Sequence, residues 1–263
     1  MTRLIPYIIL FSLFSCKQKL YRMPTGSMEE TIMPGNEFVV TETDNFERND
    51  IVVFDYFGPD YSSFDAENPG NFKMVWSKRL YRLIAYSGDY LEIKNGEVFV
   101  NSEHVPIPPK AKLPYRILSS VLIDELTDKS ENEVQMTRSG DTIIYTAFIS
   151  VEKAREFSQR KPAIISVIRV LPGIIDDSTI ARASTKGNWT NVNYGPLKIP
   201  SPGDTIQVDN NNFNFYKNIP KIRMGMNIMK EKLYFVLGDN RYSAQDSRYI
   251  GLIAHSKMYG VVK

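Results

Sequence analysis

The feature that most restricts the fold of this chain is an Asn-Gly pair between two short apolar runs. Asn95-Gly96 separates Leu91-Glu92-Ile93 from Val98-Phe99-Val100. Asn-Gly is a preferred two-residue connection in tight antiparallel hairpins, because both residues tolerate the positive φ angles of that turn. The stretch from Tyr90 to Asn101 is therefore predicted to be a hairpin.

Segments on both sides of this hairpin also have the composition of strands. They are short, rich in β-branched or aromatic residues, and bounded by Pro, Gly, Asn and Asp. The predicted strands are 37–43, 51–54, 77–85, 163–171, 205–208, 232–237 and 258–262. One clear helix is expected from Ser150 to Lys161, with Ser150 as its N-cap and Pro162 ending it. The sequence thus predicts a mainly β fold.

Charge and composition exclude several functional classes. The net charge of +2 comes from 32 basic and 30 acidic residues without a basic block, so a nucleic-acid partner is not expected. Cys16 is the only cysteine, which excludes an internal disulfide. His104 and His255 form no metal-ligand pattern, so we expect no metal and no cofactor. Neither histidine fits a Ser/His/Asp arrangement, and both are interpreted as surface or core residues.

Residues 1–23 have the layout of a signal or anchor segment followed by a tether. An apolar run from Leu4 to Phe14 contains Pro6 and is too short for a helix of about 20 residues that crosses a bilayer. The sequence Leu13-Phe14-Ser15-Cys16 resembles a bacterial lipoprotein cleavage box, although Phe14 is bulky for it. We expect Cys16 to be lipidated, with a short uncleaved anchor or a free cysteine as alternatives. In the first two cases the following domain starts at a membrane surface.

Ser27 is the candidate nucleophile of the chain. It lies in the stretch 24–32, Pro-Thr-Gly-Ser-Met-Glu-Glu-Thr-Ile, just after the apolar N-terminus. A serine hydroxyl needs a base and an oxyanion stabiliser to act as a nucleophile. Gly26 permits close approach of a substrate, and Thr25 offers a second hydroxyl. Alone, this triplet also fits an ordinary loop serine.

Four segments, in order, resemble the bacterial type I signal peptidases, which are membrane-bound serine endopeptidases. The segments are 24–32, 48–54, 82–101 and 238–251, and the last contains Gly-Asp-Asn-Arg followed by Asp-Ser-Arg-Tyr. The resemblance covers 24–101 and 234–263. It implies a coiled antiparallel β core formed by 24–103 and 230–263, with residues 104–229 as an inserted, mixed second domain.

The resemblance also implies roles for individual residues. Ser27 would attack the scissile carbonyl, a lysine would be the general base, and Thr25 would help to form the oxyanion hole. The remaining implied residues are Pro24, Met28 and Ile32 as walls of the substrate pockets, and Arg82 with Asp239 and Asp246 with Arg248 as supporting ion pairs. The substrates would be exported preproteins, cleaved after small residues on the outer, periplasmic face of the bacterial cell membrane.

The base is where the sequence departs from this family. Counting back from Gly88-Asp89 without a gap puts Arg82 on the family's arginine and Tyr81 on its lysine. Lys78 becomes the candidate base only if a bulge shifts the strand, because an odd shift otherwise turns its side chain to the opposite face. Ala244 also replaces the family serine that hydrogen-bonds the lysine.

Two functions follow from these residues. One is a membrane-anchored serine endopeptidase of the signal-peptidase type that uses Ser27 and Lys78. The other is a catalytically impaired relative, a lipid-anchored module that binds extended peptides or a partner protein. The direction of Lys78 relative to Ser27 discriminates between them.

Overall fold

The fold is organised around β4 (Met74–Tyr86), the longest of the described strands. The computed structural model describes residues 18–59, 73–127, 133–171, 180–183 and 189–263. The predicted cleavage box and Cys16 lie outside these residues. Among the described residues, no helix is long and apolar enough to cross a membrane.

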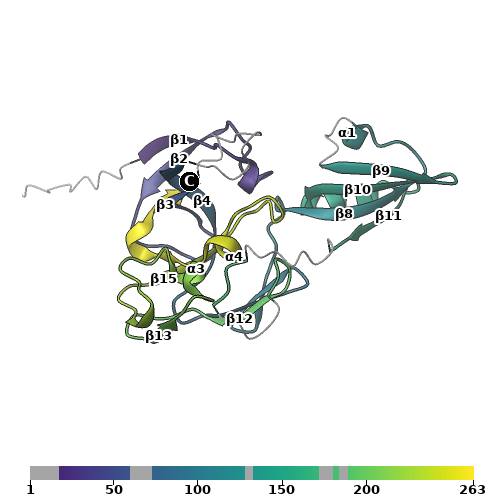
Figure 1. The fold of residues 1–263 in the computed structure, drawn as a ribbon. Helices are drawn as coiled ribbons and strands as arrows, with labels where there is room; N and C mark the ends of the chain where they lie inside the picture. Colours follow the sequence, from purple (N-terminus) through teal and green to yellow (C-terminus); the bar gives the residue numbers. More distant parts are fainter. Residues whose placement is uncertain (1–17, 60–72, 128–132, 172–179, 184–188) are drawn as a thin grey trace, which may run out of the picture.

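A seven-stranded sheet contains β4 and carries the N-terminal and C-terminal segments (Figure 1). Its strand order is β1-β2-β17-β3-β4-β15-β16, and all its pairings are antiparallel. The strands other than β4 are β1 Gln18–Arg22, β2 Glu37–Glu42, β3 Ile51–Pro59, β15 Leu233–Leu237, β16 Ile253–Ala254 and β17 Met258–Val262. The prediction of a mainly β, antiparallel fold is confirmed.

The predicted hairpin is the centre of a second, four-stranded sheet. Its order is β12-β5-β6-β7, from β5 Tyr90–Lys94, β6 Glu97–Val100, β7 Glu103–Val105 and β12 Tyr194–Lys198. Asn95 and Gly96 have φ angles of 50° and 75°, as a tight hairpin turn requires. One apolar core connects this sheet with β15, with α3 (Phe213–Tyr216) and with β13 (Thr205–Val208).

A third sheet forms a separate lobe, which lies to the right of the core in Figure 1. Its order is β11-β8-β10-β9, from β8 Lys112–Ser119, β9 Val134–Ser139, β10 Thr142–Ser150 and β11 Ile164–Arg169, with α1 Asp124–Thr127 and α2 Val151–Gln159. The lobe has its own apolar core. Ser150 caps α2 as predicted, because its hydroxyl accepts a hydrogen bond from the Lys153 amide.

The lobe spans only 112–169, which is narrower than the predicted insertion of 104–229. After the lobe, β12 pairs with β5 of the second sheet. Strand β13 then pairs with β14 (Gly225–Ile228), and Val208 and Phe215 join the core of that sheet. The second half of the predicted insertion is therefore packed into the body of the protein, because its apolar side chains complete that core.

Candidate active site

A short turn presents Ser27 beside the loop that follows β15. Residues Gly26–Met28 form a single 3-10 turn, and Ser27 is 8% exposed. The hydroxyl groups of Ser27 and Thr25 are 3.1 Å apart. The Asn240 amide donates to the Ser27 carbonyl at 3.1 Å, and the Asn240 side chain donates to the Gly26 carbonyl at 3.0 Å. Ser27 and Thr25 thus lie together, supported from a segment more than 200 residues later.

The three residues expected to line the substrate pockets have different environments. Met28 is fully buried, and its Sδ atom accepts a hydrogen bond from the Asp239 amide at 3.4 Å. This side chain is part of the apolar core below Ser27 rather than a surface that a peptide contacts. Pro24 is exposed and Ile32 is half-buried, so these two are accessible from solvent.

The two expected ion pairs are formed behind the serine turn. Arg82 holds Asp239 through two parallel hydrogen bonds of 2.8 Å and 2.6 Å. Arg248 holds Asp246 in the same way, at 2.9 Å and 2.8 Å. Planar two-point pairs of this kind fix both partners in position. Asp239 and Asp246 are both fully buried, so each depends on its arginine for neutralisation.

Tyr81 is the side chain that β4 directs toward Ser27. It is buried, and its hydroxyl donates to the Gln245 carbonyl at 3.0 Å. Burial raises the pKa of Tyr81 to about 12, although the nearby Arg79 guanidinium and a hydrogen bond with the Ser27 hydroxyl act to lower it. At neutral pH the group beside Ser27 is therefore a protonated phenol.

Ala244 belongs to the same cluster. A Cβ atom added to Gly238 would lie 2.2 Å from Ala244 Cβ, 2.7 Å from the Ser27 carbonyl oxygen and 3.5 Å from Tyr81 Cδ1. These residues are thus neighbours around one point of the backbone. The two departures noted in the sequence, Tyr81 and Ala244, meet at the position where a base and its hydrogen-bond partner would be needed.

Lys78 lies on the opposite face of β4 and is not brought to Ser27. Its Nζ atom is 2.9 Å from Asp55 Oδ1 and 3.6 Å from the centre of the Tyr259 ring. The register of β3 and β4 is continuous from the Ile51–Arg82 pair to the Pro59–Met74 pair. The bulge that would have turned Lys78 is not present in this pairing, so side-chain alternation separates Lys78 from Tyr81.

Lys112 is a site residue that the sequence did not indicate. It starts β8, is 4% exposed, and its Nζ atom lies 2.9 Å from Glu29 Oε2 while also binding Glu133. Its backbone amide donates to the Asp239 carbonyl at 2.9 Å. Burial lowers the pKa of Lys112, but hydrogen bonds to Glu133 and Glu29 outweigh this effect and raise it. Lys112 therefore connects the lobe to the serine turn.

The two histidines are engaged away from Ser27. His104 Nε2 lies 2.8 Å from Glu97, and His255 Nδ1 lies 2.9 Å from the Tyr234 hydroxyl. Both contacts occupy a ring nitrogen in a local pair. Ser27, Thr25, Tyr81 and Ala244 therefore form the candidate active site.

Comparison with known proteins identifies one family. A family model described as "Signal peptidase, peptidase S26" matches residues 1–159 and 175–263, which is nearly the whole chain. No curated protein matches the sequence significantly. The match includes every residue of the candidate active site and every described strand except β11, which lies between the two matched segments.

Proposed function

This chain belongs to the signal peptidase family S26, and from that premise we propose that it binds exported preproteins at Ser27 without turning them over. The family consists of membrane-associated serine peptidases that act on exported preproteins. In our proposal, an extended signal-peptide segment adds as a strand beside the exposed residues Pro24 and Thr25. Small side chains before the normal cleavage position would face the half-buried Ile32.

The observation that carries this proposal is that β4 places a buried tyrosine, Tyr81, beside Ser27 where a base would be needed. A general base must be within hydrogen-bond reach of the nucleophile and must be able to take its proton. With the pKa of Tyr81 at about 12, roughly one molecule in 10⁵ carries the phenolate at pH 7. Burial makes a lysine a better base, because it lowers the lysine pKa, and a tyrosine a worse one, because it raises the tyrosine pKa.

The positions of Lys78 and Ala244 support the same conclusion. The Lys78 ammonium is held by Asp55 on the other face of β4, so it does not supply the missing base. The methyl group of Ala244 offers no hydrogen bond that would orient an amine beside Ser27.

The second candidate function is cleavage of preproteins by Ser27. It is favoured by the 3.1 Å contact of the Ser27 and Thr25 hydroxyl groups, which suits a nucleophile with an oxyanion stabiliser beside it. In that reaction Ser27 Oγ would bond to the scissile carbonyl carbon, and its proton would pass to a base before reaching the leaving amine. That base would have to be Lys78 after a rearrangement of β4, or a group supplied by the substrate.

We also propose that the protein is held on the outer face of the bacterial membrane through Cys16. The support is the short apolar run before this single cysteine. A lipid on Cys16 would keep Ser27, eleven residues later, close to the membrane from which signal peptides emerge.

One experiment separates the two functions. Purified protein is incubated with a preprotein that has small residues before the scissile bond, and binding of the labelled signal peptide is measured in parallel by fluorescence anisotropy. We expect wild type to bind and not to cleave. Combined substitution of Tyr81→Lys and Ala244→Ser should create cleavage, and adding Ser27→Ala to that pair should abolish it.

Two results would overturn the proposal. Cleavage by wild type that is lost in Ser27→Ala would establish turnover, and its loss in Lys78→Ala would then assign the base. Absence of peptide binding by wild type would refute the binding role itself.

A further inference from the structure

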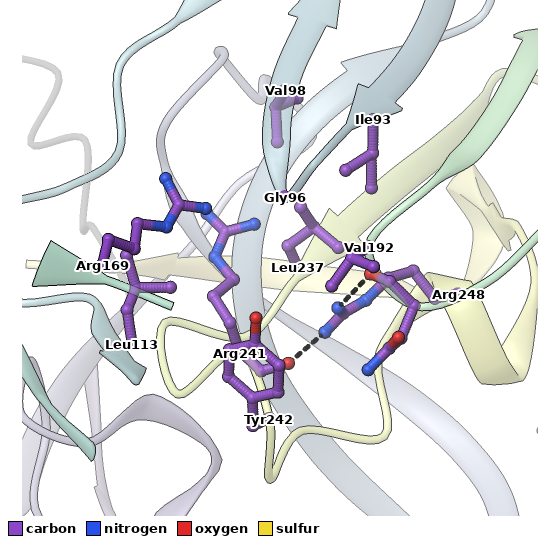
Figure 2. Close-up of a pocket in the computed structure, with 11 residues that line it drawn as sticks. Ile93, Gly96, Val98, Leu113, Arg169, Val192, Leu237, Arg241, Tyr242 and Arg248 are labelled. Atoms are coloured by element: carbon purple, nitrogen blue, oxygen red, sulfur yellow. Dashed lines mark hydrogen bonds between the residues drawn. The ribbon is translucent and has the colours of Figure 1, made fainter. Parts of the chain in front are cut away.

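A small polar cavity lies between the lobe, the β5–β6 hairpin and the loop after β15 (Figure 2). We call it the arginine cavity, after Arg169, Arg241 and Arg248, which line it. Its volume is about 10 Å³, close to the minimum that admits one water-sized ligand. In Figure 2 the guanidinium groups of Arg169 and Arg241 extend toward the same end of the cavity.

Two of these arginines are neutralised by carboxylates. Arg169 pairs with Glu97, and Arg248 pairs with Asp246. Arg248 also donates to the backbone carbonyls of Asn191 at 2.9 Å and Arg241 at 2.6 Å, which appear as dashed lines in Figure 2. These contacts engage all three nitrogens of the Arg248 guanidinium.

Arg241 is different, because its side chain has no hydrogen-bond or ion-pair partner among the described residues. It is 8% exposed, and its Nε atom is buried without an acceptor. Burial, together with the nearby Arg248, lowers the pKa of Arg241 to about 10, so the group still carries its charge at neutral pH. An uncompensated buried charge is strongly unfavourable.

The two carboxylates whose charges act on Arg241 already form ion pairs with other arginines. Asp239 is held by Arg82, and Asp246 is held by Arg248. Among the described residues, the four guanidinium groups of Arg82, Arg169, Arg241 and Arg248 are matched by the three carboxylates of Asp239, Asp246 and Glu97, which leaves one positive charge. A water molecule in the cavity would satisfy Arg241 Nε, and also the unpaired Asn191 Oδ1, but it would not neutralise this charge.

We propose that the arginine cavity binds a single small monovalent anion of the size of chloride. The volume excludes tetrahedral anions such as sulfate or phosphate, and the charge balance requires one negative charge. Arg241 would be the main ligand, with Arg169 at the side toward solvent. Gly96 makes room for Arg169, since a Cβ atom on Gly96 would lie 2.5 Å from Arg169 Nη2.

The site has a structural consequence that is independent of the proposed peptide binding. Arg169 belongs to the lobe, whereas Arg241 belongs to the loop whose Asn240 amide holds the Ser27 carbonyl. An anion shared by these arginines would fasten the lobe to the loop that supports the serine turn. Its binding should therefore stabilise the folded protein.

The test is thermal unfolding of the purified protein in sodium chloride, compared with sodium gluconate at the same ionic strength. Gluconate is too large for the cavity, so it controls for screening. We expect chloride to raise the Tm of wild type by roughly 3 °C for each tenfold increase above its dissociation constant. Bromide should replace chloride.

Two variants locate the effect. Arg241→Met keeps the length of the side chain and removes its charge; it should lose the chloride response and should be no less stable than wild type in gluconate. Arg155→Met, on the exposed face of α2, is the matched control and should respond as wild type does. An equal Tm of wild type in both salts would show that water alone fills the cavity, and a chloride response that persists in Arg241→Met would place the anion elsewhere. The wild-type comparison decides the proposal even if Arg241→Met does not fold.

Discussion

Replacing Lys112 with methionine tests how the lobe supports the serine turn. Lys112 is the buried cation between Glu29, two residues after Ser27, and Glu133 of the lobe. Methionine keeps most of the volume of the side chain and removes its charge. The carboxylates of Glu29 and Glu133 would then face each other without a cation between them. Both ion pairs with Lys112 would be lost, and the two negative charges would no longer be neutralised.

The expected loss of folding stability depends on how far the three side chains are exposed to water. Breaking a fully buried ion pair by removing one partner costs about 3–5 kcal/mol. Lys112 is 4% exposed, but the side chains of Glu29 and Glu133 are 19% and 32% exposed, so water partly solvates the two carboxylates after the change. We therefore expect a loss of about 2–3 kcal/mol, after a discount for this solvation. For a protein of this size the Tm would fall by roughly 5–10 °C.

The assay is thermal unfolding at pH 7, with Lys153→Met as the matched control. Lys153 forms ion pairs with Glu125 and Glu156 in the same lobe, but these groups are 31–49% exposed, so the control should lose less than about 1 kcal/mol. Signal-peptide affinity should also fall in Lys112→Met, because Glu29 directly follows the serine turn and its amide donates to the Gly26 carbonyl. A Tm equal to that of Lys153→Met would refute the assignment of Lys112 as the support of this turn.

Three further predictions concern other parts of the protein. Arg82→Ala leaves the fully buried Asp239 without its partner, and we expect it to lose about 3–5 kcal/mol in urea unfolding. Burial raises the pKa of Tyr81 from 10 to about 12, so the folded state favours the neutral phenol. The resulting stability is complete below pH 10 and is lost as the pH rises to 12. In Tyr81→Phe, the loss of stability between pH 10 and pH 12 should be smaller than in wild type by about 2–3 kcal/mol. Cys16→Ser should abolish incorporation of labelled fatty acid and leave residues 1–15 attached, as measured by intact mass.

Each of these predictions has a result that contradicts it. Arg82→Lys restores the charge without two-point geometry and should recover only part of the stability, so full recovery would argue against the role of that geometry. An alkaline unfolding profile that is the same in Tyr81→Phe and wild type would mean that Tyr81 does not titrate on unfolding. An unprocessed N-terminus in wild type would rule out lipidation at Cys16.

Features set by neighbours in the chain could be predicted from the sequence. Asn95-Gly96 specifies its turn because the φ angles of 50° and 75° are accessible to these two residues and unfavourable for most others. Ser150 specifies the start of α2 because its own hydroxyl satisfies an amide three residues later. The spacing back from Gly88 placed Arg82 on the family's arginine, and the resemblance then implied the ion pair with Asp239 that the structure contains.

The direction of Lys78 was left open by the sequence for a specific reason. A single bulge in β4 would have reversed it, and bulges depend on the pairing with the neighbouring strand. Only the continuous register with β3 decided that Tyr81, rather than Lys78, shares the face directed to Ser27.

The sequence by itself therefore determined the β architecture, its turns and the residues that match the family. Only the tertiary structure decided which charged side chains are buried and which of them are paired. Lys112 and Glu29 are 83 residues apart, and Arg241 has no feature in the sequence that marks it as unpaired. Whether a charged group is costly, neutralised or available to a ligand depends on burial and on partners from distant segments, and both are set only when the sheets pack against one another.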